Sequence, residues 1–300
     1  MPVSPDRRIS LGYPRRRALT VRGRRCYNCG VGKRKPTPDY SDIEVAKWRE
    51  YEDILTDSLW LMGSRANRDG HSLDYHGNFI PQIANQMFRR YTREGEIVVD
   101  WFLGSGTSAI EAVNLNRRLI GVELKTELVD YVTDKLPPEA VGDSIRLIQG
   151  DSTTSEAKAD VLRELGQMGA AKAHLAILHP PYADIIKFSD LESDLSNRSS
   201  TEEFLDGFKL VAQNAYDTLA PGRFAVLIIG DKYEGGQLDP LGFKCMGSMN
   251  DIGFKTKSII VKNIEGNEVA KGKNNNLWRY RALAGGFYIF KHEYIIVFFK

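Results

Sequence analysis

The sequence has few of the features that define several protein classes. Three cysteines in 300 residues are too few for a disulfide framework. No apolar run approaches the roughly 20 residues that span a bilayer, and the first residues lack the apolar segment of a secretory signal. We therefore expect a soluble, cytoplasmic protein that does not associate with a membrane.

Two of the cysteines, Cys26 and Cys29, have the spacing of half a zinc ribbon. No second cysteine pair or suitable histidine follows closely, and a structural zinc ion needs four ligands. The sequence therefore predicts no metal site, unless a partner chain or a distant histidine completes this half-site.

An overall excess of one charge is also missing, because 41 Lys and Arg nearly balance 39 Asp and Glu. The balance hides an asymmetry, since residues 1–36 carry eleven basic residues and one acid, which leaves a net charge of −8 for the rest. The arginines form clusters among Pro and Gly, such as Arg15, Arg16 and Arg17. We predict that residues 1–40 form a flexible basic arm that contacts nucleic acid phosphates, with a solubilising tail as the alternative.

Past the arm, predicted helices and strands alternate along the chain. Residues 42–61 predict a helix that leads into a connection, 67–78 a loop, and 81–91 a helix with proline in its first turn. Strands are then predicted at 96–101, 119–124, 144–149, 173–178 and 223–229, and helices at 108–114, 126–135, 156–168 and 201–219. This alternation predicts a parallel sheet with helices on both faces.

The end of the chain departs from this alternation. Strands are predicted at 257–261 and 294–299, and the residues between them are a polar, Asn- and Gly-rich excursion rather than a helix. Residues 41–300 are thus predicted to form one α/β domain, with a doubly wound, mostly parallel seven-stranded sheet that ends in an antiparallel edge pair.

A glycine-rich turn is predicted where the first strand of this sheet leads into its helix. Gly104 and Gly106 follow Asp100 there, and glycines let the backbone approach a ligand closely at the carboxyl edge of a sheet. Glu123 and Asp151 end the next two strands, where a carboxylate can accept hydrogen bonds from a ribose diol. Each acid alone is more often a helix cap, but the ordered series predicts a site for a nucleoside cofactor.

A second motif, His179-Pro180-Pro181-Tyr182, directly follows the apolar run of the fourth strand. Downstream of Phe-Leu-Gly-Ser-Gly-Thr at 102–107, it resembles the amino-methyltransferases that produce N6-methyladenine or N4-methylcytosine in DNA. The resemblance covers about residues 75–300. It implies a Rossmann-like fold, S-adenosylmethionine as cofactor and double-stranded DNA as partner.

The resemblance also assigns residues to roles. The catalytic residues would be His179, Pro180, Pro181 and Tyr182. The cofactor would be bound by Phe79, Pro81, Asp100, Phe102, Gly104, Ser105, Gly106, Thr107, Glu123 and Asp151. An exocyclic amino nitrogen is a poor nucleophile, and acceptors on the first residue's side chain and a proline carbonyl would localise its lone pair. Tyr182 would stack on the extruded base.

His179 departs from the family's pattern, which usually has Asp, Asn or Ser at this position. A neutral imidazole offers one acceptor nitrogen, whereas an imidazolium offers only donors. We therefore expect activity to fall as the pH drops through the histidine's pKa, ordinarily ~6.5. A neutral polar group slightly favours N4 of cytosine over N6 of adenine. An RNA methyltransferase acting on guanine N2 in tRNA and a catalytically silent DNA-binding relative remain alternatives.

Further DNA contacts are predicted after the catalytic motif and near the end of the chain. Lys187 lies in a polar loop at 183–200, and Lys271, Lys273 and Arg279 lie close to aromatic residues in the second segment. Cations interleaved with aromatic rings suit contact with phosphates and bases. No large recognition domain is predicted, so these segments, the arm or a partner would read the DNA sequence. A cognate restriction nuclease and the oligomeric state are left open.

Overall fold

Helices and strands alternate along most of the chain. The computed structural model describes residues 38–63, 78–181, 189–264 and 275–300. The helices are α1 (Pro81–Tyr91), α2 (Thr107–Asn114), α3 (Thr126–Lys135), α4 (Ser155–Gln167), α5 (Thr201–Thr218), α6 (Leu241–Ile252) and α7 (Asn275–Gly285), with short 3-10 helices η1 (Val45–Glu50) and η3 (Leu195–Asn197). The strands are β1 (Leu59–Trp60), β2 (Ile97–Asp100), β3 (Arg118–Glu123), β4 (Ile145–Gln149), β5 (Ala173–Leu178), β6 (Leu219–Ile229), β7 (Lys232–Glu234), β8 (Gln237–Asp239), β9 (Lys255–Asn263) and β10 (His292–Phe299).

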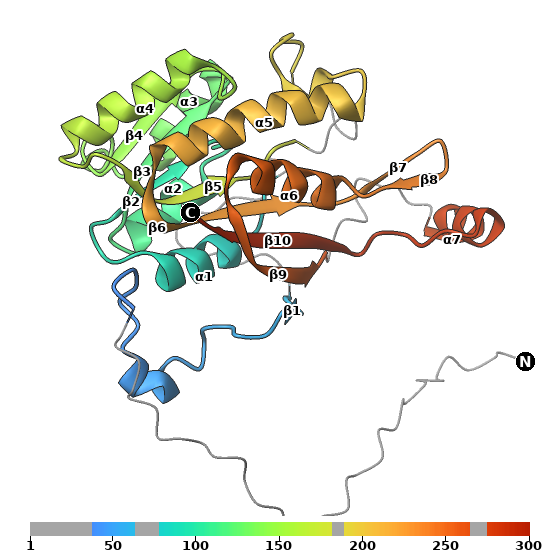
Figure 1. The fold of residues 1–300 in the computed structure, drawn as a ribbon, viewed down its shortest axis with the longest axis horizontal. Coiled ribbons are helices and arrows are strands. Elements are labelled where there is room, and N and C mark those ends of the chain that lie inside the picture. Colours follow the sequence, from blue (N-terminus) through green and yellow to red (C-terminus); the bar gives the residue numbers. More distant parts are fainter. Residues whose placement is uncertain (1–37, 64–77, 182–188, 265–274) are drawn as a thin grey trace, which may run out of the picture. The chain divides into compact units, whose positions relative to one another are not determined.

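The main sheet has eight strands in the described part of the chain, in the order β1-β9-β10-β6-β5-β2-β3-β4 (Figure 1). Strands β6, β5, β2, β3 and β4 run parallel, and β10 is antiparallel to both of its neighbours, β6 and β9. The predicted mostly parallel, doubly wound sheet with an antiparallel pair at the end of the chain is confirmed. The sheet contains one strand more than predicted, because β1 pairs with β9.

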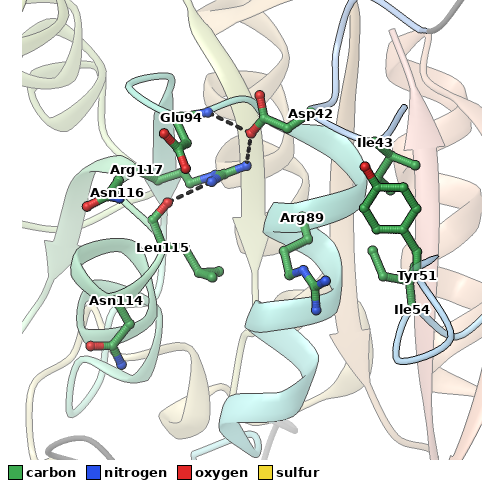
Figure 2. A pocket seen from close by; sticks show the side chains of 10 residues that line it. All are labelled: Asp42, Ile43, Tyr51, Ile54, Arg89, Glu94, Asn114, Leu115, Asn116 and Arg117. Atoms are coloured by element: carbon green, nitrogen blue, oxygen red, sulfur yellow. Dashed lines mark hydrogen bonds and ion pairs between the residues drawn. The ribbon is translucent and has the colours of Figure 1, made fainter. Parts of the chain in front are cut away.

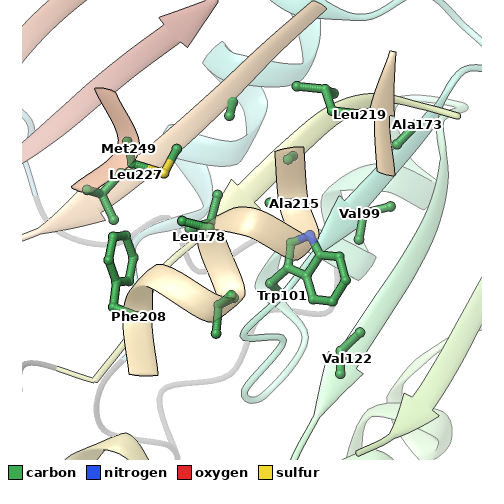
Figure 3. Packing of buried hydrophobic residues seen from close by; sticks show 14 of the residues in the cluster. Val99, Trp101, Val122, Ala173, Leu178, Phe208, Ala215, Leu219, Leu227 and Met249 are labelled. Carbon is green, nitrogen blue, oxygen red and sulfur yellow. The ribbon is translucent and has the colours of Figure 1, made fainter. Parts of the chain in front are cut away.

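Helices cover both faces of the sheet. The side chains of α4, α5 and α6 pack on one face, where Trp101, Phe208 and Met249 lie against strand residues (Figure 3). The side chains of α1, α2 and α3 pack on the other face in a second apolar cluster. Strand β5 is almost entirely apolar because a central parallel strand is buried on both faces.

Two predictions of local structure are wrong. Residues 42–61 contain the 3-10 helix η1 and the strand β1 rather than an α-helix. The Gln86 side chain on α1 pairs with the backbone of Asp53 and Leu55 instead, with both hydrogen bonds at 2.8 Å. The polar segment between β9 and β10, predicted to contain no helix, includes the helix α7. This helix is mostly exposed, so it has no apolar face, and hydrophobic periodicity in the sequence could not reveal it.

Residues Thr37–Lys300 form one compact unit. None of the helices within the described ranges is long and apolar enough to cross a membrane. The predicted basic arm, residues 1–40, falls almost entirely outside the described residues and stays a prediction.

Candidate active site

The glycine-rich turn after β2 depends on backbone angles that favour glycine. Gly104 and Gly106 have φ values of +55° and +82°, in the left-handed region where other residues are strained. A Cβ on Gly106 would lie 2.7 Å from Cγ1 of Val132 on α3. Thr107 then begins α2, so the turn passes directly from the strand into the helix N-terminus.

Glu123, at the end of β3, is bound to this turn. Its Oε2 accepts a hydrogen bond from the Gly104 backbone N–H at 2.9 Å, and its Oε1 accepts one from the Lys125 N–H at 3.0 Å. Burial raises the pKa of the carboxyl group, and these two hydrogen bonds oppose the shift. Each oxygen keeps a second lone pair, so the carboxylate is held in place and can still accept bonds from a diol.

Asp100 stabilises the glycine turn through hydrogen bonds in the protein interior. It is fully buried and accepts hydrogen bonds from the Phe102 N–H at 3.0 Å and from the Ser108 hydroxyl on α2. Burial raises the pKa of Asp100 to about 6, although both hydrogen bonds lower it. The carboxylate therefore ties the end of β2 to the first turn of α2.

The end of β4 carries the predicted Asp151, and it is linked to its neighbours through Ser152 and Asn214, which the sequence did not single out. Oδ1 of Asp151 accepts from the backbone N–H and the hydroxyl of Thr153, at 2.9 and 2.8 Å. The buried Ser152 hydroxyl donates to the Trp101 carbonyl at 2.6 Å, and Asn214 of α5 donates to the Ser152 carbonyl at 2.9 Å. The sequence offered one sign of the link to Trp101: Ser152, a hydrogen-bonding residue, directly follows Asp151.

Residues 78–81 lie against the glycine turn from the start of α1. Asn78 donates its side-chain amide to the Ser105 hydroxyl. Phe79 is buried, and Pro81 is the first residue of α1 and is also buried. Asn78 is a site residue that the sequence analysis missed, although its position beside Phe79 in the segment 78–81 pointed to it.

His179 follows the last residue of β5 and contacts Phe79. The two rings meet edge to face, with centroids 5.3 Å apart. Burial lowers the pKa of His179 to about 4, while Glu293 raises it and Lys262 lowers it. The loss of activity on protonation of His179 stays a prediction, and its expected midpoint moves from the ordinary ~6.5 to about 4.

The cofactor and catalytic candidates converge because β2 lies between β3 and β5 in the sheet. The glycine turn, Glu123 and His179 lie at the carboxyl ends of these three neighbouring strands, and Pro180 is buried directly beyond His179. Arg279 is exposed on α7. Pro181 is partly buried and is the last described residue before residue 189. The other candidates lie outside the described residues: Arg15, Arg16, Arg17, Cys26, Cys29, Tyr182, Lys187, Lys271 and Lys273.

Residues 189–197 add an acid that the sequence did not reveal. Asp194 is buried and accepts hydrogen bonds from the Ser189 hydroxyl at 2.7 Å and the Ser196 backbone N–H at 2.8 Å. Its charge contributes to the raised pKa of Glu123, which indicates that this segment lies near the cofactor edge. In the described ranges, no group of three or more His, Cys, Asp or Glu could hold a metal ion.

A cavity of about 240 Å³ lies at the opposite edge of the sheet (Figure 2). Its lining comes from segments that precede β2 and β3, such as Glu94 and Arg117, and from residues 42–54. Arg117 is buried and donates to Asp42 and to the Leu115 carbonyl, both at 2.6 Å. These groups satisfy one another, so the cavity is a seam between the N-terminal segment and the sheet rather than part of the candidate active site.

Comparisons with known proteins show which families the sequence resembles. A family model described as DNA methylase, of the N6/N4 type, matches residues 32–134. The type II methyltransferase M.MjaII of Methanocaldococcus jannaschii is 34% identical over 28% of this chain and 18% of its own length. The orphan methyltransferase M.BamHII of Bacillus amyloliquefaciens is 27% identical over 39% of this chain and 47% of its own. The resemblance to DNA amino-methyltransferases is confirmed.

The similarity covers only part of each relative. The probable type III restriction-modification enzyme HindVI Mod subunit of Haemophilus influenzae is 34% identical over 31% of this chain, which is 12% of its own length. The matched segment thus spans less than half of each of these curated relatives. Among solved structures, TrmN from Thermus thermophilus has a TM-score of 0.47 and 15% identity, over 75% of this chain and 50% of that one.

Proposed function

We propose that this chain is a DNA amino-methyltransferase, which transfers a methyl group from S-adenosylmethionine to the exocyclic amino group of a base. One observation carries the proposal: the braced glycine turn after β2 and the His179-Pro180-Pro181 segment after β5 follow adjacent parallel strands. A cofactor bound at the first would present its reactive end beside the second. The matched DNA methylase sequence adds independent support.

The residues at the carboxyl edge fit this cofactor. The backbone of Gly104 and Gly106 brings no side chain between the turn and a ligand, and the buried Glu123 carboxylate can accept from the ribose hydroxyls. Phe79 and Asp151 would border the two ends of the site. When bound, the cofactor supplies an electrophilic methyl group on its sulfonium.

The chain's own contribution to the chemistry is to position the amino group. A neutral His179 accepts one N–H of the amino group, and the Pro180 carbonyl accepts the other, so that the nitrogen lone pair points at the methyl group. Proline keeps this carbonyl in one orientation. The base must leave the duplex to reach these groups, which costs ~a few kcal/mol, and stacking on Tyr182 would offset that cost.

The target base and the DNA contacts are the finer parts of the proposal. A neutral acceptor in place of a carboxylate slightly favours N4 of cytosine over N6 of adenine. Double-stranded DNA is the partner, contacted by the basic arm, by Lys187, Lys271 and Lys273, and by Arg279 and Arg281 on α7. The names of the curated relatives raise a restriction-modification role, in which a nuclease would be the cognate partner.

The test is to incubate the full chain with labelled S-adenosylmethionine and unmethylated DNA, and to identify the labelled nucleoside by mass spectrometry. We expect N4-methylcytosine, or N6-methyladenine if the preference for cytosine is wrong. His179→Ala should reduce transfer at least ~100-fold, since it removes an acceptor from the transition state. His292→Gln, on the other face of the sheet, is the matched control and should retain activity.

Two results would contradict the proposal. Label found in RNA but not in DNA would instead support the guanine-N2 methyltransferase. Cofactor binding without transfer to any nucleic acid would identify a silent DNA-binding relative, and the replacement of the usual acceptor by His179 would then explain the loss.

A further inference from the structure

Two buried charged residues near His179 have no role in the proposed cofactor site. Nζ of Lys262 on β9 donates to Oε1 of Glu293 on β10 at 2.9 Å. Lys262 is only 5% exposed and Glu293 only 7% exposed. Charges removed from water act strongly on their neighbours, because solvent no longer screens them.

The register of the sheet places this pair on the face covered by α1. Three isoleucines lie side by side across neighbouring strands: Ile228 of β6, Ile295 of β10 and Ile260 of β9. All three belong to the apolar cluster on the face covered by α1. Glu293 and Lys262 each lie two residues from the isoleucine in their own strand. Residues two apart share a face, so both side chains point to the α1 side, one step nearer the carboxyl edge.

His179 lies on the same face and at the same edge. Leu178 is in register with Leu227 and belongs to the core on the opposite face, so the next residue alternates to the α1 side. The contact between His179 and the ring of Phe79 confirms this direction. His179, Glu293 and Lys262 therefore approach one another from β5, β10 and β9 at one edge of the sheet.

The two charges have opposite effects on His179. Among the described residues, Glu293 favours the imidazolium and raises its pKa, whereas Lys262 opposes it and lowers the pKa. Without Lys262, the carboxylate would stabilise a protonated His179 as a buried ion pair. A protonated ring has no acceptor nitrogen and would repel the amino group of a base.

We propose that Lys262 and Glu293 are a positioning pair, in which the lysine neutralises the carboxylate so that His179 stays an uncharged hydrogen-bond acceptor. The pair acts through His179 and not on the reacting atoms. The inference rests on the proposed function for the role of His179, but the charge state of the ring can be measured without any methyl transfer.

The test is an NMR titration of the full chain with ¹⁵N-labelled histidine. The sequence has five histidines, and the His179→Asn variant assigns the signal of His179. We expect Lys262→Met to raise the titration midpoint of His179 by at least about one pH unit, a tenfold increase in proton affinity. Glu293→Gln should not raise it, and the double variant should return it close to the wild-type value.

Matched controls separate this role from a purely structural one. Lys262→Arg keeps the positive charge and should keep the wild-type titration. His174, near the start of β5, should titrate identically in every variant. Loss of packing alone would move the two single variants in the same direction, and that result would overturn the proposal, as would an unchanged midpoint in Lys262→Met. If Lys262→Met does not fold, a raised midpoint in Glu293→Gln would overturn it.

Activity then distinguishes the two proposals. Where transfer is measured, kcat of Lys262→Met should fall as the pH drops through about 5, one unit above the corresponding fall in the wild type, with an unchanged KM for S-adenosylmethionine. If the titrations follow the prediction but no variant transfers methyl groups, the proposed function fails and the positioning pair stands. If wild-type transfer is found and the titrations do not change, the positioning pair alone is overturned.

Discussion

At the scale of single residues, burial determines the charge of the groups on which the site depends. The same loss of solvent keeps His179 neutral and raises the pKa of the Asp100 and Glu123 carboxyl groups. The partly buried His179 ring gains from this environment, because its uncharged form is the hydrogen-bond acceptor. The charged forms of Asp100 and Glu123 are disfavoured by burial, and hydrogen bonds from backbone N–H groups and from the Ser108 hydroxyl stabilise them.

The free energy of unfolding should report the neutral state of His179. Its pKa is ordinarily ~6.5 in an unfolded chain and about 4 in the folded protein, so its contribution is complete above pH 6.5 and declines as the pH falls toward 4. Between pH 7.5 and 5, we expect the wild type to lose about 2 kcal/mol more than His179→Asn. Urea unfolding at both pH values measures this difference. Equal losses in the two proteins would show that the ring titrates normally.

Ser108 should stabilise the ionised form of Asp100. Asp100 has a pKa of about 6, above its ordinary value, so its contribution to stability is present below its unfolded pKa and is lost as the pH rises through 6. We expect Ser108→Ala to lower the free energy of unfolding at pH 7 by about 1–3 kcal/mol, and by less at pH 4, where the carboxyl group is neutral. Thr133→Ala is the control, since that exposed hydroxyl donates to the Val129 carbonyl in the preceding turn of its own helix. A loss that does not depend on pH would contradict this role.

At the scale of elements, the site is built from the ends of strands. Each turn that follows β2, β3 and β4 is held by a side chain of its own or of a neighbouring strand end, as Glu123 holds Gly104 and Ser152 holds Trp101. Such links align the turns before a cofactor arrives, which lowers the entropy that binding must overcome.

The glycine turn should not tolerate a side chain. Gly106→Ala combines a left-handed backbone with a Cβ 2.7 Å from Val132, and we expect a loss of about 1–3 kcal/mol in the free energy of unfolding. Gly247→Ala, in the middle of α6 with open space around it, should instead stabilise the protein by roughly 0.5–1 kcal/mol. Thermal unfolding and calorimetry with S-adenosylmethionine measure both variants. Normal cofactor affinity in Gly106→Ala would argue against the proposed site.

At the scale of the whole molecule, the two edges of the sheet have different roles. The carboxyl edge contains the candidate active site. At the amino edge, Arg223 forms a two-point ion pair with Glu96, and Arg117 bridges several elements through Asp42 and Thr92. These groups are satisfied within the described protein and connect strand starts to the N-terminal segment. The proposed catalytic groups and the structural ion pairs thus lie at opposite edges of the sheet.

Helix α7 should be part of the DNA-binding surface. It directly precedes β10 in the chain (Figure 1), and the first residue of β10 lies at the carboxyl edge. Arg279, Arg281 and Tyr280 are exposed on it, and the Arg281 guanidinium lies 5.3 Å from the centre of the Trp278 ring. Replacing both arginines by alanine should reduce the slope of log affinity against log salt by about 2, in filter-binding measurements on duplex DNA. Arg163→Ala, an exposed arginine on α4, should leave the slope unchanged. An unchanged slope in the double variant would place the DNA elsewhere.

Much of the fold is encoded locally and was predicted from the sequence. The bounds of 81–91, 126–135 and 173–178 match α1, α3 and β5 to the residue, because apolar periodicity and a starting proline act over a few residues. The glycine turn and the acids that end β3 and β4 follow from the same short-range logic. Residues 42–61 were mispredicted because their backbone is held by Gln86 on α1 rather than by their own neighbours.

The chemical state of the site was decided only by the tertiary structure. Sequence alone identified His179 and its tetrapeptide, but it placed the titration of the ring near its ordinary pKa. The neutral ring depends on burial against Phe79, and the charges that act on it come from Lys262 and Glu293, more than eighty residues further along the chain. Local patterns determine where strands and turns form, whereas desolvation and electrostatics depend on which distant residues the fold brings together.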